Sequence, residues 1–410
     1  MNGRALRTLV VATEYPWPRN SGSRLRLENT LAGLAGCGPV ELFSAVSESR
    51  TDFAEPPASP ALVRVKRIAI DDRPPSPAEM IRGVVRAGMP FEMPWRARGE
   101  VSAALGRFVG GPYDLVWFFQ VRAWVLAGDV IARPGVIDID DLEDEKIRAR
   151  SSLPRRPDEQ RGRLRRLGAR AWTAEDVRRW RRLHRLAARR ARATVVCSEL
   201  DAARSGLAGV RVLRNGYPEP LRPVGRTGVA SPPVVVFQGT LRYPPNADAA
   251  RYLVEEVGPA LRRSVPDARI RLVGVAPDAL QDLDDPPSVT LAGQVPEIAA
   301  ELAWADIVII PLRYGSGTRV KILEAFAHRI PVVSTTLGAE GLEVSAGRHL
   351  LVADDPEGLA RACARLLADG ELRARIVEQA HGLYLARYRS SVVQEEIGRL
   401  ARDVSGKADG

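Results

Sequence analysis

Short apolar runs alternate with helical patterns through the second half of this 410-residue chain. Apolar runs of this length are typical of strands that are buried on both faces of a sheet. The expected strands are residues 234–239, 269–275, 289–293, 306–311, 331–335 and 349–353, and the expected helices are 246–264, 296–305, 319–328 and 357–368. This alternation predicts an α/β fold with a doubly wound parallel sheet. Such sheets bind ligands at the carboxyl ends of their strands, so the loops after these runs are the places to search for a site.

The first half repeats the pattern less regularly. Its expected strands are residues 7–13, 40–46, 63–70, 113–119, 134–140 and 193–198, with a helix over 23–36 and an irregular, proline-rich stretch over 71–100. Residues 217–233 contain many prolines and glycines without periodicity, which predicts a linker. At roughly 200 residues per domain, the sequence predicts an N-terminal domain over 1–216 and a C-terminal domain over 234–384, with a final helix and tail over 385–410.

A glycine turn follows the expected strand 306–311. Gly315 and Gly317 permit positive φ and a close approach of the backbone to a ligand. Thr318 fits the N-cap of a helix that begins at Arg319, so the free N–H groups of its first turn face the loop. Helix N-termini attract anions, and Arg319 and Lys321 add two positive charges. The turn therefore predicts an anion site.

Lys321, Glu324 and His328 follow at i, i+3 and i+7 on one face of the same helix. Cations and a carboxylate around a helix N-terminus suit a nucleotide diphosphate, with the phosphates on the N–H groups and the ribose hydroxyls on Glu324. The alternative is structural. Glycine turns precede helices in many α/β proteins, and Lys321 with Glu324 would then be an ordinary surface ion pair.

Cysteine usage and hydropathy narrow the class of protein. Cys37, Cys197 and Cys363 lack the spacing of a metal site and are expected to be structural thiols in a reducing compartment. No apolar run reaches the ~18 residues that a membrane span needs. The short apolar stretch near the N-terminus predicts a first strand rather than a signal peptide. The expected location is cytoplasmic, with peripheral contact at the inner face of the plasma membrane.

Positive charge is concentrated in residues 146–192, which hold 18 Lys and Arg against 4 Asp and Glu, whereas the whole chain has a net charge of +10. The segment is expected to be helical, with Trp172, Trp180, Leu183 and Leu186 as its apolar positions. One interpretation is a docking surface for anionic lipid headgroups or a diphosphate-linked acceptor. The alternatives are phosphate contacts with nucleic acid and a solvated helix face.

Three further segments together resemble a known family. Residues 193–220 run from a strand through Ser198 to a turn at Asn215 and Gly216. Residues 237–249 read FQGTLRYPPNADA, and residues 315–342 read GSGTRVKILEAFAHRIPVVSTTLGAEGL. Their order and spacing resemble the family-4 retaining glycosyltransferases with the GT-B fold, most strongly over 233–380. The resemblance implies two Rossmann-like domains facing a central cleft, a nucleotide-diphosphate sugar as donor, and a final helix that crosses back to the N-terminal domain.

The resemblance also implies donor-binding roles for residues of the C-terminal domain. Glu324 matches the second glutamate of the family's paired-glutamate motif, which is expected to hold the ribose hydroxyls. The amides of Gly317 and Thr318 are expected to lie against the diphosphate. The turn from Gly239 to Arg242 is expected to face the same phosphates from the other side.

Two positions depart from the family pattern. The family's first glutamate usually stands eight residues before Glu324 and contacts the transferred sugar, but this chain has Ser316 there. Asn246 stands near a position where lysine is common. Arg319 and Lys321 are expected to supply the missing positive charge, and Ser316 is retained as a donor-site residue.

The N-terminal domain is expected to supply the acceptor side. Gly22 matches the family's N-terminal glycine loop, which approaches donor and acceptor; the alternative is an ordinary turn between strand and helix. Many members carry a histidine after the strand 134–140, where this chain has Asp138, Asp140 and Asp141. Asp141, with Asp138 near it, is the expected group that orients or deprotonates the acceptor hydroxyl. The alternatives are a metal-binding Asp-x-Asp pair, which belongs to the other glycosyltransferase fold, and a cluster that supports the following helix.

The expected function is that of a metal-independent glycosyltransferase in polysaccharide biosynthesis, acting on a glycan, a lipid-linked or a small-molecule acceptor. Arg319 and Lys321 are expected to stabilise the diphosphate as it leaves. No cofactor is expected beyond the nucleotide sugar itself, and nucleic acid is not the expected partner. The alternatives are a nucleotide-sugar 2-epimerase with the same fold and a catalytically degenerate protein that only binds sugar nucleotides.

Overall fold

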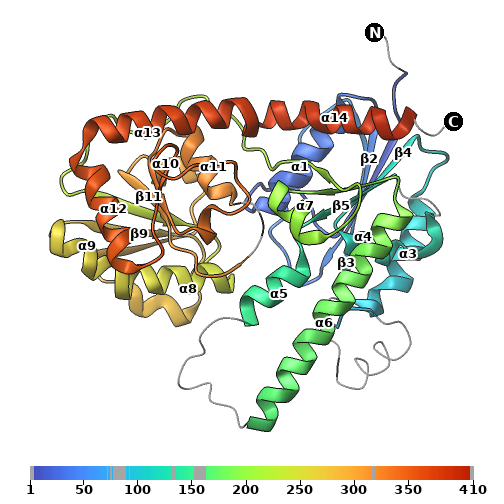
Figure 1. Ribbon diagram of the computed structural model, residues 1–410. Helices are drawn as coiled ribbons and strands as arrows, with labels where there is room; N and C mark the ends of the chain where they lie inside the picture. Colours follow the sequence, from blue (N-terminus) through green and yellow to red (C-terminus); the bar gives the residue numbers. More distant parts are fainter. Residues whose placement is uncertain are drawn as a thin grey trace. The chain divides into compact units, whose positions relative to one another are not determined.

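The computed structural model describes residues 4–71, 73, 76, 89–91, 93–131, 135–151, 163–315, 317 and 319–406. The chain divides into two compact units, of which the first comprises Met1–Arg214 and Val393–Gly410 and the second comprises Asn215–Val392. Each unit contains one parallel sheet with helices packed over it (Figure 1). The prediction of two doubly wound α/β domains is therefore confirmed.

The first unit contains a seven-stranded sheet in the order β3-β2-β1-β4-β5-β6-β7. The strands are β1 (Thr8–Ala12), β2 (Val40–Ser47), β3 (Leu62–Ile70), β4 (Leu115–Phe119), β5 (Val136–Asp140), β6 (Ala193–Val196) and β7 (Arg211–Val212). The order reverses at β1, which pairs with β2 on one side and with β4 on the other. Ligands of doubly wound sheets bind where the order reverses, at the carboxyl ends of the strands.

Helices cover this sheet and enclose two apolar layers of core residues. They are α1 (Gly22–Ala35), α3 (Arg98–Phe108), α4 (Val121–Ala127), α5 (Glu143–Ser151), α6 (Arg163–Arg190), α7 (Glu199–Ser205) and the later turns of α14 (Ser390–Gly406). Ile397 of α14 lies so close to Gly33 of α1 that a β-carbon on Gly33 would stand 2.8 Å from its β-carbon. Glycine at this position allows the two helices to pack together.

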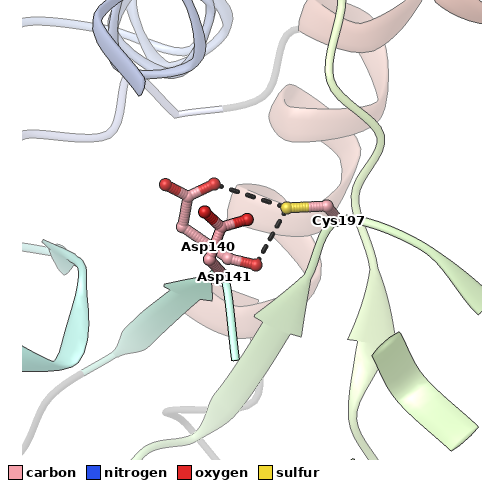
Figure 2. A group of neighbouring side chains, drawn as sticks. All are labelled: Asp140, Asp141 and Cys197. Atoms are coloured by element: carbon pink, nitrogen blue, oxygen red, sulfur yellow. Dashed lines mark hydrogen bonds between the residues drawn. The ribbon is translucent and has the colours of Figure 1, made fainter. Parts of the chain in front are cut away.

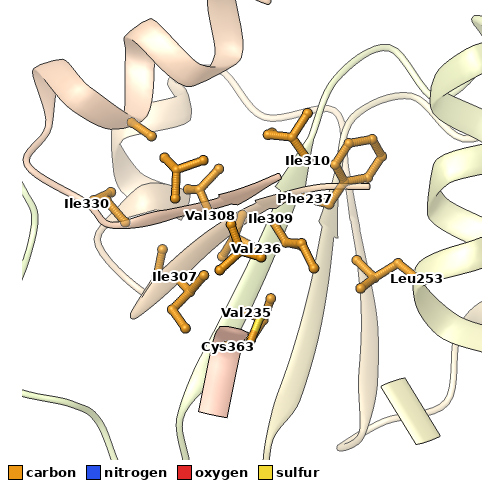
Figure 3. Packing of buried hydrophobic residues seen from close by; sticks show 14 of the residues in the cluster. Val235, Val236, Phe237, Leu253, Ile307, Val308, Ile309, Ile310, Ile330 and Cys363 are labelled. Carbon is orange, nitrogen blue, oxygen red and sulfur yellow. The ribbon is translucent and has the colours of Figure 1, made fainter. Parts of the chain in front are cut away.

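The second unit contains a six-stranded parallel sheet in the order β10-β9-β8-β11-β12-β13. Its strands are β8 (Val234–Gln238), β9 (Arg269–Val273), β10 (Val289–Gly293), β11 (Ile307–Ile310), β12 (Val332–Ser334) and β13 (Leu351–Val352). Its helices are α8 (Pro244–Tyr252), α9 (Gly258–Ser264), α10 (Ile298–Leu302), α11 (Val320–Ala327), α12 (Pro356–Ala368) and α13 (Gly370–Leu383). The central strands β8 and β11 are buried along their whole length, and Figure 3 shows their side chains packed with Leu253 and Cys363.

The structure adds detail where sequence periodicity was weak. Residues 217–233, predicted as a linker, are packed onto the second unit: the amide of Gly225 donates to the carbonyl of His328, and the amide of Ala230 to Asp306. The final helix, predicted within residues 385–410, begins at Ser390 because Arg389 has extended backbone. Among the residues that the structure describes, no helix has the length and apolarity needed to cross a bilayer.

Candidate functional site

The turn before α11 has the backbone geometry that its glycines predict. Gly315 has φ 124° and Gly317 has φ 84°, which are values that side chains rarely tolerate. The helix begins at Val320 with Arg319 as its N-cap residue, one residue later than predicted. Arg319 is buried, and its guanidinium packs against Gly315. A β-carbon on Gly315 would stand 3.3 Å from Nη2 of Arg319. Ser316 and Thr318 lie outside the described residues.

The side chain of Lys321 extends from the first turn of α11 toward the carboxyl end of β8. Its Nζ donates to Oδ1 of Asn246 over 2.9 Å and lies 4.5 Å from the ring centroid of Phe237. The amide nitrogen of Asn246 donates to the carbonyl of Thr240, which orients its oxygen toward the lysine. Burial, and then the nearby Arg319, lower the pKa of Lys321 to about 7. This ammonium is poorly solvated and would gain strongly from an anionic partner.

Glycines directly after β8 and β9 let the backbone pack closely beside this lysine. A β-carbon on Gly239 would stand 2.8 Å from Nζ of Lys321, and Gly239 itself has φ 149°. A β-carbon on Gly274 would stand 1.9 Å from the carbonyl oxygen of Gly239, so both positions require glycine. The absence of side chains at these two positions therefore lets the backbone of this sheet edge approach the lysine ammonium closely. Arg242, three residues further along the predicted phosphate turn, is exposed.

Glu324 lies one turn further along α11 and is partly buried. Its Oε1 accepts from the hydroxyl of Tyr217 over 2.6 Å, and its Oε2 accepts from the amide of Gln238 over 3.3 Å. Burial raises the pKa of this carboxyl, while both hydrogen bonds act in the opposite direction. Lys321 and Glu324 thus have separate partners, which differs from the ordinary surface ion pair considered as the alternative.

The first unit gathers polar side chains at the carboxyl ends of β1, β4 and β5. Asp138, expected to be catalytic, is fully buried, and its two oxygens accept from Nε and Nη2 of Arg26 over 3.0 and 2.9 Å. A carboxylate engaged in this way anchors α1 to β5. Gly22 is the exposed first residue of α1, after the N-cap Ser21.

Asp140, Asp141 and Cys197 form a tight cluster directly beyond β5 and β6 (Figure 2). Their ligand-type atoms lie within 4.8 Å of one another. The thiol of Cys197 donates to the carbonyl oxygen of Asp140 over 2.9 Å, and burial raises the pKa of this thiol well above its usual range. Lys146 reaches Asp141 over 2.7 Å. A protonated thiol and a carboxylate already paired with lysine are a poor donor set for a metal ion.

Asp140 has an unusual backbone and an altered acidity. Its φ is 59°, a left-handed value that is uncommon outside glycine. Burial and the neighbouring Asp141 raise its pKa to about 7, while Arg26 opposes the change. Strained backbone and shifted acidity together are common at functional sites.

Sequence reasoning missed four polar residues at these two edges. Gln120 follows β4 with φ 70°, and its side-chain oxygen accepts from the hydroxyl of Thr13, which follows β1. In the second unit, Tyr217 and Gln238 hold Glu324. A polar residue directly after an apolar strand was the available signal for Thr13, Gln120 and Gln238. Tyr217 carried no such signal, because its contact with Glu324 joins distant segments.

Comparison with known proteins identifies the second unit. Residues 232–369 match the family described as Glycosyl transferases group 1. The matched segment lies within the second unit and covers about a third of the chain. The matched segment contains Gly239, Asn246, Lys321 and Glu324, so the polar edge described above lies inside it. The expected resemblance to the family-4 glycosyltransferases is confirmed over this segment.

Solved structures match over the full length, and they establish the GT-B fold. Sucrose-phosphate synthase from Thermosynechococcus elongatus superposes with a TM-score of 0.70 and 16% identity, covering 99% of this chain and 100% of that one. HepE from Anabaena, solved in complex with UDP-glucose, superposes with a TM-score of 0.63 and 16% identity, covering 97% and 100%.

Among curated proteins, the phosphatidyl-myo-inositol mannosyltransferase of Mycolicibacterium smegmatis is 32% identical over 155 residues, which are 36% of this chain and 40% of that protein. An exopolysaccharide phosphotransferase of Streptomyces coelicolor is 28% identical over 164 residues, or 37% of this chain and 17% of that protein. The chain thus spans less than half the length of the curated relatives it matches.

Proposed function

We propose that this protein transfers a hexosyl group from a nucleotide-diphosphate sugar to a hydroxyl of a glycan, a lipid-linked acceptor or a small molecule, with retention of configuration. The observation that carries the proposal is the Lys321 ammonium held by Asn246 and packed against the backbone of Gly239 at the carboxyl end of β8. Breaking a sugar–phosphate bond concentrates negative charge on the leaving diphosphate. A preorganised cation in a poorly solvated site stabilises that charge.

The donor would occupy the carboxyl edge of the second sheet. Phosphates would meet Lys321, buried Arg319 and the amides that follow Gly315, including those of Gly317 and Thr318. Glu324 would accept from the ribose hydroxyls. Ser316 and Arg242 remain proposed donor contacts. Because these protein groups supply the positive charge, the proposed transfer proceeds without a metal ion.

The acceptor would bind at the carboxyl edge of the first sheet, near Gly22 and the Asp140–Asp141 pair. Asp141 is the proposed group that orients the acceptor hydroxyl, because it lies 2.7 Å from Lys146 and is more exposed than Asp138. Asp138 is proposed to position this edge through Arg26. Polysaccharide biosynthesis at the cytoplasmic face of a membrane is the proposed setting.

Nucleotide binding tests the donor site. UDP, GDP, dTDP and ADP are added separately to the protein, and the melting temperature is recorded. One nucleotide is expected to raise the melting temperature, and Glu324→Ala should remove that shift while its own melting curve stays cooperative, because Glu324 acts on the ribose. UDP is the first choice, since HepE was solved with UDP and with UDP-glucose.

The nucleotide-binding result and a turnover assay together distinguish the competing functions. An undiminished shift in Glu324→Ala would show that the donor site is elsewhere. Binding without turnover of any nucleotide sugar would favour the degenerate binding protein, and an epimerised donor would favour the 2-epimerase. Product analysis after incubation with UDP-glucose distinguishes transfer, epimerisation and no reaction.

The outer face of α6 is proposed to contact anionic lipid. Four exposed arginines recur along one face of this helix with i+3 and i+4 spacing: Arg178, Arg182, Arg185 and Arg189. Leu186, beside the stripe, is 38% exposed, and Trp172 is 47% exposed with its ring stacked on Phe91. Arginines beside exposed apolar side chains suit a membrane surface that carries negative headgroups.

Replacing the four α6 arginines by glutamine is expected to weaken binding to phosphatidylglycerol vesicles at least tenfold, since each basic residue near such a surface contributes about 1 kcal/mol. Vesicle co-sedimentation at low and high salt measures the effect, with pure phosphatidylcholine vesicles for comparison. The matched control replaces four exposed arginines of the second unit: Arg263, Arg361, Arg365 and Arg375. Equal losses in both variants would show general charge attraction and contradict a docking surface on α6.

A further inference from the structure

The carboxylate of Glu324 is held by two neutral donors from different segments. The hydroxyl of Tyr217 donates over 2.6 Å and the amide of Gln238 over 3.3 Å, one to each oxygen. A carboxylate offers about four lone-pair positions, so two donors leave room for two more. The 2′- and 3′-hydroxyls of a ribose would require two. Tyr217 therefore orients the carboxylate without using up its capacity.

The backbone of Tyr217 forms hydrogen bonds with residues near the C-terminal end of the second unit's sequence. Its amide donates to the carbonyl of Tyr388 over 2.8 Å, and its carbonyl accepts from the amide of Ser390 over 2.9 Å. The two chain segments pair in parallel here, with Tyr217 opposite Arg389. The hydroxyl of Tyr384 also donates to the carbonyl of Tyr217 over 3.2 Å.

These contacts lie beside both places where the chain passes from one unit to the other. The first passage follows Arg214, and the second follows Val392. Tyr217 stands three residues after the first passage, and its partner Ser390 stands shortly before the second. One side chain thus connects the proposed ribose carboxylate to both connecting segments.

We propose that Tyr217 is a positioning residue that orients Glu324 for the ribose and transmits donor binding to the two segments connecting the units. The inference rests on the proposed function, because it requires a ribose at Glu324. A ribose that orders the carboxylate also orders the tyrosine hydroxyl. The backbone hydrogen bonds of Tyr217 then open less often.

The groups around Glu324 determine how the loss of the Tyr217 hydroxyl would change the pKa of this carboxyl. Lys321 is the neighbouring cation on the same helix, and Gln238 is the uncharged neighbour on β8. The ring of His328 lies 6.5 Å from that of Tyr217, and burial lowers its pKa, which keeps it neutral near pH 7. Without the tyrosine hydroxyl, burial of Glu324 is less well compensated, so the carboxyl binds a proton at higher pH. A protonated carboxyl is a poorer acceptor for ribose.

Two variants, each lacking one hydroxyl group, distinguish a positioning role of Tyr217 from a general effect on protein stability. Tyr217→Phe removes the hydroxyl on Glu324, and Tyr384→Phe removes a hydroxyl on the same backbone carbonyl but leaves Glu324 untouched. Calorimetry compares UDP, GDP and ADP with their 2′,3′-dideoxy forms. Tyr217→Phe is expected to bind the preferred ribonucleotide roughly tenfold more weakly, the scale of one hydrogen bond to a charged group. It should bind the dideoxy form as the unaltered protein does, and its low-pH loss of affinity should move to higher pH.

Hydrogen exchange measures the transmitted effect. In the unaltered protein and in Tyr384→Phe, the bound ribonucleotide is expected to slow amide exchange in peptides covering 215–219 and 388–392. In Tyr217→Phe, at saturating nucleotide, this slowing should be lost. Unchanged ribonucleotide affinity in Tyr217→Phe, or slowing that persists there, would overturn the inference while nucleotide binding still supports the proposed function. Absence of nucleotide binding by the unaltered protein would overturn both.

Discussion

Replacing Lys321 by alanine is expected to lower kcat by about 100- to 1,000-fold, the usual effect of removing one preorganised group from a developing anion. The donor KM should change much less, because charge on the leaving diphosphate grows mainly toward the transition state. The structure supports this expectation through the tight placement of Nζ between Asn246, the Phe237 ring and Gly239. Steady-state turnover of the nucleotide sugar that binds is the measurement.

A matched control is available elsewhere in the chain. Lys66 is an exposed lysine on β3 of the first unit, and Lys66→Ala should leave both parameters unchanged. If Lys321→Ala raised KM with kcat intact, the lysine would contribute only ground-state binding. The leaving-group role would then have to be assigned to Arg319.

The pH dependence of kcat/KM provides a second test of Lys321. With its pKa lowered to about 7, the ammonium of the free protein loses its proton as the pH rises through that value. The donor kcat/KM, which reports ionisations of the free enzyme, should therefore decline above pH 7. A bound diphosphate favours the charged lysine, so kcat should decline only at higher pH. Lys321→Ala should lack this alkaline limb.

Much of the fold could be predicted from the sequence because its central strands are continuous apolar runs. The strands β8, β11 and β4 are buried along their whole length, and no other simple structure accommodates such runs between helical patterns. The predicted ends of helices were less accurate, because they depended on one or two residues at the helix terminus. The helix after the glycine turn begins at Val320 rather than Arg319, since Arg319 takes the N-cap position.

The donor edge could be predicted in part. Gly315, Gly317, Lys321 and Glu324 stand close together in sequence, and one helix turn dictates their arrangement. The partners that hold them could not be predicted, because Asn246 lies 75 residues from Lys321 and Tyr217 lies 107 residues from Glu324. Such pairs depend on how strands order themselves in the sheet, which periodicity does not reveal.

The aspartates near the end of β5 are close in sequence, and their roles could not be told apart before the packing was known. The sequence favoured Asp141 as the catalytic group but also placed Asp138 among the catalytic residues. In the structure, the strand alternation turns Asp138 inward onto Arg26, whereas Asp141 lies beyond the strand and meets Lys146. Sequence alone could not show that α1 presents an inward-facing arginine.

Replacing Asp138 by asparagine is expected to destabilise the first unit by about 3–5 kcal/mol, because the buried Arg26 guanidinium loses the carboxylate that accepts two of its hydrogen bonds. Arg26 is 3% exposed and Asp138 is 0% exposed, so water cannot replace the lost carboxylate. Asp140 is a weaker partner, since its Oδ1 lies 3.5 Å from Nε of Arg26, further than the oxygens of Asp138. Urea unfolding followed by tryptophan fluorescence measures the change, and six of the seven tryptophans belong to the first unit.

Two companion variants distinguish anchoring from chemistry. Asp403→Asn breaks an exposed ion pair with Arg211 in the same unit and should cost less than about 1 kcal/mol, as is usual for surface pairs. Asp141→Asn should leave the unfolding curve nearly unchanged and lower kcat, provided that Asp141 orients the acceptor hydroxyl. If Asp138→Asn were as stable as the unaltered protein yet inactive, the buried pair would be part of the chemistry, and Asp138 rather than Asp141 would be the residue that acts on the acceptor.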